Sequence, residues 1–212
     1  MSEPGAEQGL LSDLEILQRL VADGERCIFV SPLIDPMNQL GPSSLDLHVG
    51  ADLSVTRTIE STHIDLNTTK EEVKRQIGEY FQVRRIEHGG PFVLHPGEFT
   101  LASTLEYIRL PKDIAARLEG RSSFGRLGLQ IHATAGFVDP GFEGTLTFEL
   151  INSGKLPVKL RPGIRLGQIC FYKVERVQVG YMEKLNSKYG RKYHVELSRV
   201  DGDPEIPSKS KP

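Results

Sequence analysis

The sequence predicts a mainly β protein of the barrel or jelly-roll type, with a few short helices. From residue 81 onward the 212-residue chain consists of short runs of alternating apolar and polar residues, separated by turn residues. Two of these turns read His95-Pro96-Gly97 and Arg161-Pro162-Gly163, where proline followed by glycine suits a type II turn. Many short strands joined by tight turns are typical of barrels and jelly rolls.

A helix is expected near the N-terminus. Residues 12–15, Ser-Asp-Leu-Glu, form a capping-box pattern that marks the start of a helix, and Gly24 is expected to end it. The apolar residues expected to share one face of this helix are Leu14, Leu17, Leu20 and Val21.

A strand and a second helix are expected next. Residues 42–49 alternate as a strand does. The residues expected to point inward are Leu45, Leu47 and Val49, and those expected to point outward are Ser44, Asp46 and His48. Thr69 and Glu72 repeat the capping-box pattern, so we interpret residues 67–80 as a short charged helix inserted at the surface.

Length and composition indicate one domain and exclude several classes of protein. No break divides the chain, so we expect a flexible N-terminus over 1–9, one domain over 10–200 and a disordered, proline-bearing tail over 201–212. The net charge of −2 and the pI near 6.3 argue against a nucleic-acid partner. Cys27 and Cys170 have no paired spacing and the N-terminus lacks a secretion-signal pattern, so reduced thiols and a cytoplasmic location are expected. No apolar run approaches the ~20 residues of a membrane-spanning helix.

Residues 120–149 carry most of the chemistry. Residues 121–126, Arg-Ser-Ser-Phe-Gly-Arg, offer backbone N–H groups, hydroxyls and two permanent cations, which suit a polyphosphate. Gly120 and Gly125 fit the first half of a P-loop. Arg126 and Leu127 stand where that motif needs lysine and serine or threonine, so this is not a Walker motif.

Glu149 occupies an unusual position in a predicted strand. Thr145, Thr147 and Glu149 alternate with apolar residues, so a carboxylate stands where a half-buried strand favours valine or threonine. Because burying a carboxylate is costly, this placement predicts a functional role. A structural glutamate paired with an arginine is the alternative.

This segment resembles the dCTP deaminase family, which is related to the trimeric dUTP pyrophosphatases. The resemblance extends to LHPGEFTLASTLEYIRLP, NSGKLPVKLRPGIRLGQICF and a C-terminal SKY; it covers residues 9–200 and is densest over 91–173. It implies a distorted jelly-roll or β-barrel subunit of the dUTP pyrophosphatase type, in a homotrimer with sites at the subunit boundaries. It also implies dCTP as substrate, Mg²⁺ bound through the triphosphate, and a place in the supply of dUMP as a thymidylate precursor. Binding of dUTP, and of dTTP as an effector, is left open.

The resemblance implies four catalytic groups. Glu149 would activate the water that attacks C4 of cytosine, a task for which other deaminases use zinc. Ser122 and the carbonyl of Ala135 would hold this water, and Arg126 would stabilise the tetrahedral intermediate from across the subunit boundary. Residues 194–196, His-Val-Glu, mimic half of a zinc deaminase motif, but no P-C-x-x-C follows, so no metal site built by the protein is expected.

The resemblance also implies a set of substrate contacts. Asp139 would contact the deoxyribose 3′-OH, the backbone of residues 147–149 would read the cytosine edge, and residues 181–200 would fold over the nucleotide as a lid. Lys192 stands where the family usually has a glutamine. The expected substrate-binding residues are Arg121, Ser123, Phe124, Gly125, Asp139, Thr147, Phe148, Gln168, Tyr181, Lys188 and Lys192.

Gly136 and Phe137 indicate which products are formed. They match the subgroup that also cleaves the triphosphate and releases dUMP and pyrophosphate, whereas deaminase-only members have a His-Arg pair there. Three alternatives remain at this point: a deaminase that stops at dUTP, a dUTP pyrophosphatase without deamination, and a non-catalytic dNTP-binding trimer.

Overall fold

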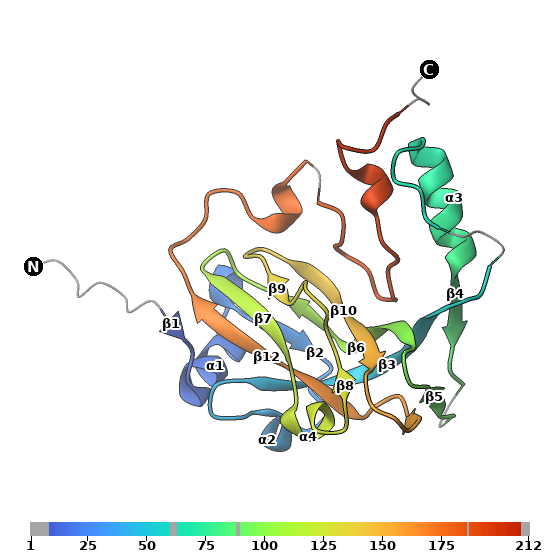
Figure 1. Ribbon diagram of the computed structural model, residues 1–212. Coiled ribbons are helices and arrows are strands. Elements are labelled where there is room, and N and C mark those ends of the chain that lie inside the picture. Colours follow the sequence, from blue (N-terminus) through green and yellow to red (C-terminus); the bar gives the residue numbers. More distant parts are fainter. Residues whose placement is uncertain (1–8, 60–62, 88–89, 186, 209–212) are drawn as a thin grey trace, which may run out of the picture.

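The computed structural model describes residues 9–59, 63–87, 90–185 and 187–208. The N-terminal residues 1–8, expected to be flexible, and residues 209–212 of the expected tail lie outside the described residues. The main sheet is antiparallel, in the order β8, β10, β6, β3, β12, β7, β9, and β1, β2 and β4 pair with β12, β6 and β3. A second sheet pairs β11 with β5. The mainly β prediction is therefore confirmed (Figure 1).

The strands are β1 (Gly9–Leu10), β2 (Phe29–Ser31), β3 (Leu45–Thr56), β4 (Phe81–Arg85), β5 (Phe92–Leu94), β6 (Phe99–Arg109), β7 (Ile114–Gly120), β8 (Leu129–Gln130), β9 (Phe137–Val138), β10 (Glu143–Asn152), β11 (Val158–Leu160) and β12 (Arg165–Lys173). The helices are α1 (Asp13–Leu20), α2 (Pro36–Gln39), α3 (Lys70–Tyr80) and α4 (Ser122–Gly125), with 3₁₀ turns η1 (Gly24–Arg26), η2 (Tyr181–Glu183) and η3 (Val200–Gly202). None of the helices described here is both long and apolar enough to span a membrane.

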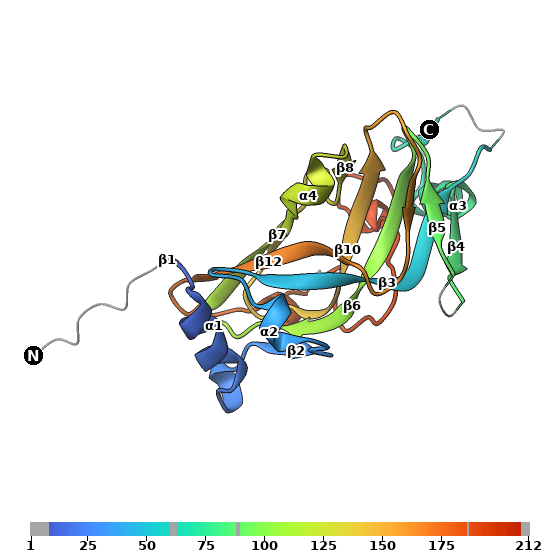
Figure 2. The ribbon, with the colours of Figure 1, turned by 90° about the horizontal axis from the view of Figure 1, so that it is seen from below.

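The long strand β3 joins two layers of the curled sheet. Residues 45–48 pair with β12, residues 52–56 pair with β4, and residues 49–55 pair with β6 along the opposite edge. In Figure 2, β12 and β3 run across the view whereas β10 and β6 rise steeply. The space inside this curl is filled by apolar side chains from both layers, including the fully buried Phe148 and Phe171.

Both predicted Pro-Gly turns have the expected geometry. Gly97 has φ +78° and Gly163 has φ +85°, which favours glycine over any residue with a side chain. The N–H of Glu98 donates to the carbonyl of His95 at 3.0 Å, and the N–H of Ile164 donates to that of Arg161 at 3.3 Å. These bonds close four-residue turns that introduce β6 and β12.

Helix α1 begins as predicted but buries a different face. Ser12 is the N-cap and its capping box with Glu15 is complete. The helix ends at Leu20, before Gly24, and Leu14 and Val21 are 61 % and 79 % exposed. The buried residues are Ile16 and Arg19, since the Arg19 guanidinium pairs with Asp113 on the body of the protein. The ion pair of Arg19 therefore helps to orient α1, and the pattern of leucines did not predict which face is buried.

His48 does not point outward. It is buried and its Nδ1 lies 2.5 Å from Glu106 Oε1 in the middle of β6. The carboxylate of Glu106 also accepts from the His48 N–H and from Gln39 Nε2. Alternation places an imidazole on the outer side of β3, but α2 covers that side and supplies Gln39 as a partner.

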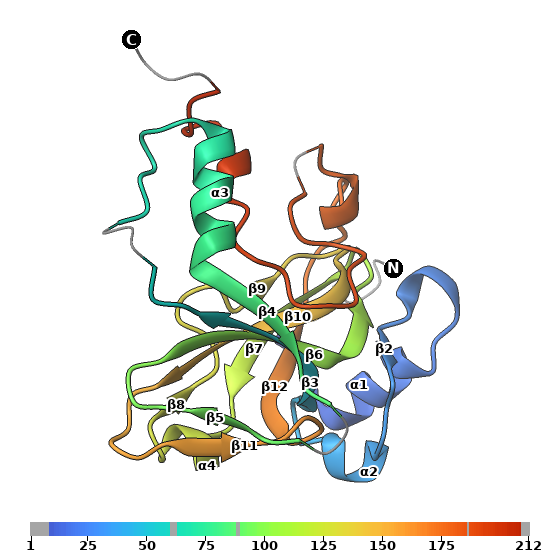
Figure 3. The same ribbon diagram turned by 90° about the vertical axis from the view of Figure 1, so that its right-hand side faces the viewer.

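The C-terminal residues up to 208 do not form the expected disordered tail. Ile206 is 4 % exposed and packs in a second apolar cluster with Val73 and Ile77 of α3. The N–H of Lys70 donates to the carbonyl of Pro207 at 3.0 Å. Figures 1 and 3 show this segment beside α3. The helix predicted within 67–80 is confirmed as α3, with Thr69 as its N-cap, and its apolar face packs against Ile206.

Candidate active site

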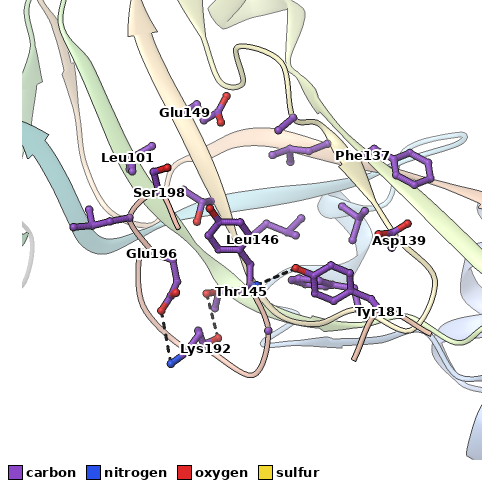
Figure 4. Close-up of a pocket in the computed structure, with 18 of the residues that line it drawn as sticks. Leu101, Phe137, Asp139, Thr145, Leu146, Glu149, Tyr181, Lys192, Glu196 and Ser198 are labelled. Carbon is purple, nitrogen blue, oxygen red and sulfur yellow. Dashed lines mark hydrogen bonds and ion pairs between the residues drawn. The ribbon is translucent and has the colours of Figure 1, made fainter. Parts of the chain in front are cut away.

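A cavity of about 460 Å³ opens along the outer face of β10. Its walls come from β10, from the segment 135–142, from β4 and β6, and from the C-terminal segment 181–198. Figure 4 shows Glu149 at one end of this cavity and Lys192 with Glu196 at the other. The expected site residues that line it are Ala135, Phe137, Asp139, Thr147, Glu149, Tyr181 and Lys192.

Glu149 is held in place by backbone bonds on both its main chain and its side chain. Residues of β10 alternate between half-buried and buried, with Thr145, Thr147 and Glu149 on the half-buried face, as the sequence predicted. The N–H of Glu149 donates to the carbonyl of Ile131 at 2.8 Å. Its Oε2 accepts from the N–H of Ala133 at 2.7 Å. The carboxylate therefore has one fixed donor and faces a cavity.

One residue of β10 has backbone groups without a strand partner. The N–H of Thr145 donates to Lys192 at 3.0 Å and that of Glu149 to Ile131 at 2.8 Å, both away from β6. Residues two apart present their backbone groups on the same side of a strand, so those of Thr147 point to this edge as well. Between Lys192 and Ile131, no described residue pairs with this edge. A planar molecule with a donor and an acceptor could pair there.

The C-terminal segment closes the other side of the cavity. Besides Lys192, which accepts from Thr145, the N–H of Arg191 donates to the carbonyl of Glu143 at 2.6 Å, in the manner of an added strand. Tyr193 stacks on Tyr107 with ring centroids 4.8 Å apart. Burial and the neighbouring Glu143 carboxylate raise the pKa of Tyr107 above its ordinary range. The Tyr107 phenol is thus neutral and can donate a hydrogen bond to Glu143, beside the stacked Tyr193 of the C-terminal segment.

The other expected site residues do not line this cavity. Arg121 and Phe124 are half-buried at α4, whereas Ser122, Ser123, Gly125 and Arg126 are exposed there. Phe148 lies in the core on the opposite face of β10, so only its backbone could contact a ligand. Lys188 forms an ion pair with Asp203. Asp139, which does line the cavity, forms an ion pair with Lys184 at 3.1 Å. Gln168 lies on β12, opposite Glu119 of β7, and is not among the residues that line the cavity.

In a single chain the expected site residues therefore form two separate groups, which we call half-sites. One holds Glu149, Thr147 and Asp139, and the other holds the exposed α4 loop with Arg121 and Gln168. The second contains two charged residues that the sequence analysis did not single out, Asp46 and Arg165. Asp46 belonged to a predicted outward strand face, and its closeness to residues 121 and 165 depends on pairing across β3, β12 and β7.

Position 136 requires a glycine because the backbone of Leu118 lies too close to leave space for a side chain. A Cβ at this position would lie 2.8 Å from the carbonyl oxygen of Leu118, and the N–H of Leu118 donates to the carbonyl of Gly136 at 2.7 Å. Phe137, the next residue, is 63 % exposed and borders the cavity. A side chain at position 136 would force the 134–137 loop to a different path.

The described residues contain no group of three or more His, Cys, Asp or Glu side chains placed to hold a metal ion. Cys27 and Cys170 are both free, and burial raises the pKa of the Cys170 thiol.

Comparison with known proteins identifies the family. A family model described as dCTP deaminase-like matches residues 10–174. The chain belongs to the dCTP deaminase-like family. It is 43 % identical over 201 residues to a protein of Methanothermobacter thermautotrophicus named dCTP deaminase, dUMP-forming, covering 93 % of this chain and 96 % of that one. It is 39 % identical over 198 residues to a dCTP deaminase of Haloarcula marismortui, covering 93 % and 97 %.

The fold agrees with a solved member of this dCTP deaminase-like group. The crystal structure of 2′-deoxycytidine 5′-triphosphate deaminase from Agrobacterium tumefaciens superimposes with a TM-score of 0.59 at 24 % identity. The match covers 79 % of this chain and spans about half, 49 %, of that one. The expected architecture of the distorted jelly-roll type is thereby confirmed as the fold.

Proposed function

We propose that this protein hydrolyses dCTP, removing the 4-amino group of cytosine, and then cleaves the triphosphate to release dUMP and pyrophosphate. The observation that carries the proposal is the Glu149 carboxylate. It faces a cavity, accepts one hydrogen bond from the described residues and lies two residues from an unpaired strand edge. Family membership and relatives of about 40 % identity named for this reaction support it.

The base is recognised by the edge of β10. The backbone N–H and C=O of Thr147 point between Lys192 and Ile131, where they can pair with the edge of a pyrimidine. A purine in the same register would need more space toward Glu149. Leu101, Leu118 and Leu146 line the cavity and give the ring an apolar surface.

Glu149 acts as the general base. Because Oε2 accepts from Ala133, the carboxylate has a fixed orientation and Oε1 is left for a water molecule. Glu149 takes a proton from this water as the oxygen attacks C4, and passes it to N3 of the ring. The C4 hydroxyl of the tetrahedral intermediate then gives its proton, through Glu149, to the amino group. The amino group leaves as ammonia and C4 becomes the carbonyl of uracil, which completes hydrolysis without a protein-bound metal.

The triphosphate needs the second half-site. Ser122 and Arg126 are exposed and do not line the Glu149 cavity, so a second copy of the chain would bring them to it. A homotrimer would form three such composite sites. Mg²⁺ would enter as part of the substrate, coordinated by the phosphates, and the protein would supply cations and hydroxyls around it.

The dUMP-forming step depends on the loop at Gly136. The close approach of Gly136 to Leu118 draws the loop against β7 and leaves Phe137 at the mouth of the cavity. In this proposal, the arrangement leaves space for a water molecule in line with the α-phosphorus. Asp139, three residues on, would hold the 3′-OH after releasing Lys184.

The test is an assay of the purified protein with dCTP and Mg²⁺, in which ammonia and pyrophosphate are measured and nucleotides are separated. Equal amounts of ammonia, dUMP and pyrophosphate are expected. Ammonia with dUTP would limit the activity to deamination, and dUTP cleavage without deamination of dCTP would contradict the proposal. Binding of dCTP without products would indicate a nucleotide-binding protein instead. Glu149→Gln should greatly slow ammonia release. Glu119→Gln, which changes a strand carboxylate outside the cavity, is the matched control.

A further inference from the structure

A cluster of opposite charges lies beside α4, outside the Glu149 cavity. It consists of Asp46 on β3, Arg121 at the end of β7 and Arg165 at the start of β12. One carboxylate oxygen of Asp46 serves both arginines: its Oδ2 lies 3.3 Å from Arg121 Nε and 3.4 Å from Arg165 Nη1. With two guanidinium groups and one carboxylate, the cluster keeps one net positive charge.

The two arginines are also fastened by backbone oxygens. Arg121 Nη1 donates to the carbonyl of Arg165 at 2.8 Å, and Arg165 Nη1 donates to the carbonyl of Asn38. Each guanidinium is therefore held on one side and keeps further N–H groups for another acceptor. Planar guanidinium groups in fixed orientations are the preferred partners of phosphate oxygens.

A neutral donor extends the cluster. Gln168 lies directly opposite Asp46 across the β3–β12 pair, and its Oε1 accepts from the hydroxyl of Ser44 at 3.3 Å. Because the amide oxygen is occupied, the NH₂ group of Gln168 is left as a donor. The hydroxyls of Ser122 and Ser123 follow Arg121 directly and are exposed. Two guanidinium groups, an amide NH₂ and two hydroxyls that can donate are therefore gathered here, and this set suits a polyanion.

Burying the Asp46 carboxylate costs free energy, so its position indicates a function. Its side chain is 13 % exposed, and burial raises the pKa of the carboxyl although Arg121 and Arg165 act to lower it. Without this carboxylate the two guanidinium groups would repel each other and lose their common anchor.

We propose that Asp46 is a positioning residue that sets Arg121 and Arg165 as a two-cation clamp for the polyphosphate end of the nucleotide. Arg165 is the second cation of this clamp and Asp46 acts through both arginines without touching substrate. The inference rests on the proposed function, because it assigns the phosphates of dCTP to this half-site.

The test compares steady-state kinetics of Asp46→Asn and Asp52→Asn with dCTP. Asp52 is a matched control: it lies on the same strand, is 16 % exposed and pairs with Arg85 at 3.1 Å, but belongs to no half-site. For Asp46→Asn the KM for dCTP should rise roughly 10- to 100-fold with kcat within about threefold, as for a misplaced binding group. Asp52→Asn should leave both constants unchanged.

Inhibition by dUMP separates positioning from general damage. This nucleotide has the base, sugar and α-phosphate but lacks the terminal phosphates, so its inhibition constant should not change in Asp46→Asn. The double variant with Arg121→Met should cost less than the sum of the single changes, because Asp46 acts through Arg121. Arg165→Met should also raise the KM for dCTP selectively, and it carries the same test if Asp46→Asn does not fold.

The outcomes distinguish this inference from the proposed function. A wild-type protein that releases no ammonia from dCTP would overturn the proposed function. An active wild type whose KM is unchanged by Asp46→Asn would overturn the clamp alone. A parallel loss of dCTP and dUMP binding, or a fall in kcat with lowered thermal stability, would assign Asp46 a structural role and also overturn the clamp.

Discussion

Two carboxylates on neighbouring strands, Glu106 on β6 and Glu149 on β10, have opposite surroundings. Glu106 is fully buried, and its oxygens accept from His48 Nδ1, the His48 N–H and Gln39 Nε2 at 2.5–3.3 Å. Glu149 is half-buried, faces a cavity and, in the described part of the chain, accepts only from the N–H of Ala133. Glu106 is enclosed by partners from β3 and α2, so its role is to hold these elements together, whereas Glu149 lies beside an open space and can exchange a proton with a bound water molecule.

The largest expected effect is on catalysis at Glu149. Glu149→Gln should lower kcat for ammonia release by about 10²–10⁴-fold, because the amide cannot take a proton from water. Thermal unfolding should change little, since the amide still accepts from Ala133 through its oxygen. Ammonia assays and a melting curve on the same preparation check both parts. A variant that keeps more than a tenth of the wild-type rate would show that the base lies elsewhere.

The next effect is on stability at Glu106. Glu106→Ala should lower the free energy of unfolding by about 3–5 kcal/mol, because His48 and Gln39 lose a buried partner. Urea unfolding measures this loss. The activity per folded molecule should stay close to that of the wild type. If instead catalysis fell while stability held, the roles assigned to the two carboxylates would be reversed.

A smaller effect is expected at Gln39. Gln39→Met should lower the free energy of unfolding by about 1–2 kcal/mol, less than Glu106→Ala, because the carboxylate keeps its bonds from His48. Gln39 is buried and also donates to the carbonyl of Asp46 at 3.1 Å, so the loss should exceed that of a surface substitution. The same urea series gives this value, and a loss equal to that of Glu106→Ala would mean that α2, not the carboxylate, anchors the network.

The last effect concerns the pH dependence of stability. Burial raises the pKa of Glu106 above its ordinary value of 4.5, so the folded state binds a proton more tightly than the unfolded state. The associated stabilisation is complete below pH 4.5 and is lost as the pH rises through the folded-state pKa. The loss is at most about 1.4 kcal/mol per pH unit. Glu106→Gln should remove this part of the slope in urea unfolding between pH 4.5 and 7, and identical slopes would contradict it.

Local chemistry made parts of this molecule predictable. The Pro-Gly turns, the Ser12 capping box and the alternation around Glu149 each depend on neighbouring residues alone, and the structure has them as expected. The orientation of α1 was wrong because Arg19 finds its partner, Asp113, ninety-four positions away. His48 was placed outward for the same reason, since Glu106 lies on another strand.

The site was predictable only in its separate parts. The motifs around Ser122 and Glu149 name the groups that we propose to react, but no local pattern shows that one chain holds them apart. Asp46 and Arg165 were not predicted as site residues from the sequence, because neither stands out from its neighbours along the chain. They come together only through the pairing of β3, β12 and β7. Ile206 was assigned to a disordered tail because its neighbours are polar, and only α3 gives it a place to be buried.

The path of β3 between two layers has a consequence for the timing of folding on the ribosome. The first half of β3, with Leu45 and Leu47, pairs with residues 165–169 of β12. At about 5–20 residues per second, the roughly 120 residues between them take about 6–24 s to synthesise. Throughout that interval a strand bearing two leucines has no partner along one edge. The nascent chain is therefore most exposed to aggregation, and most dependent on chaperones, in the seconds before β12 leaves the exit tunnel.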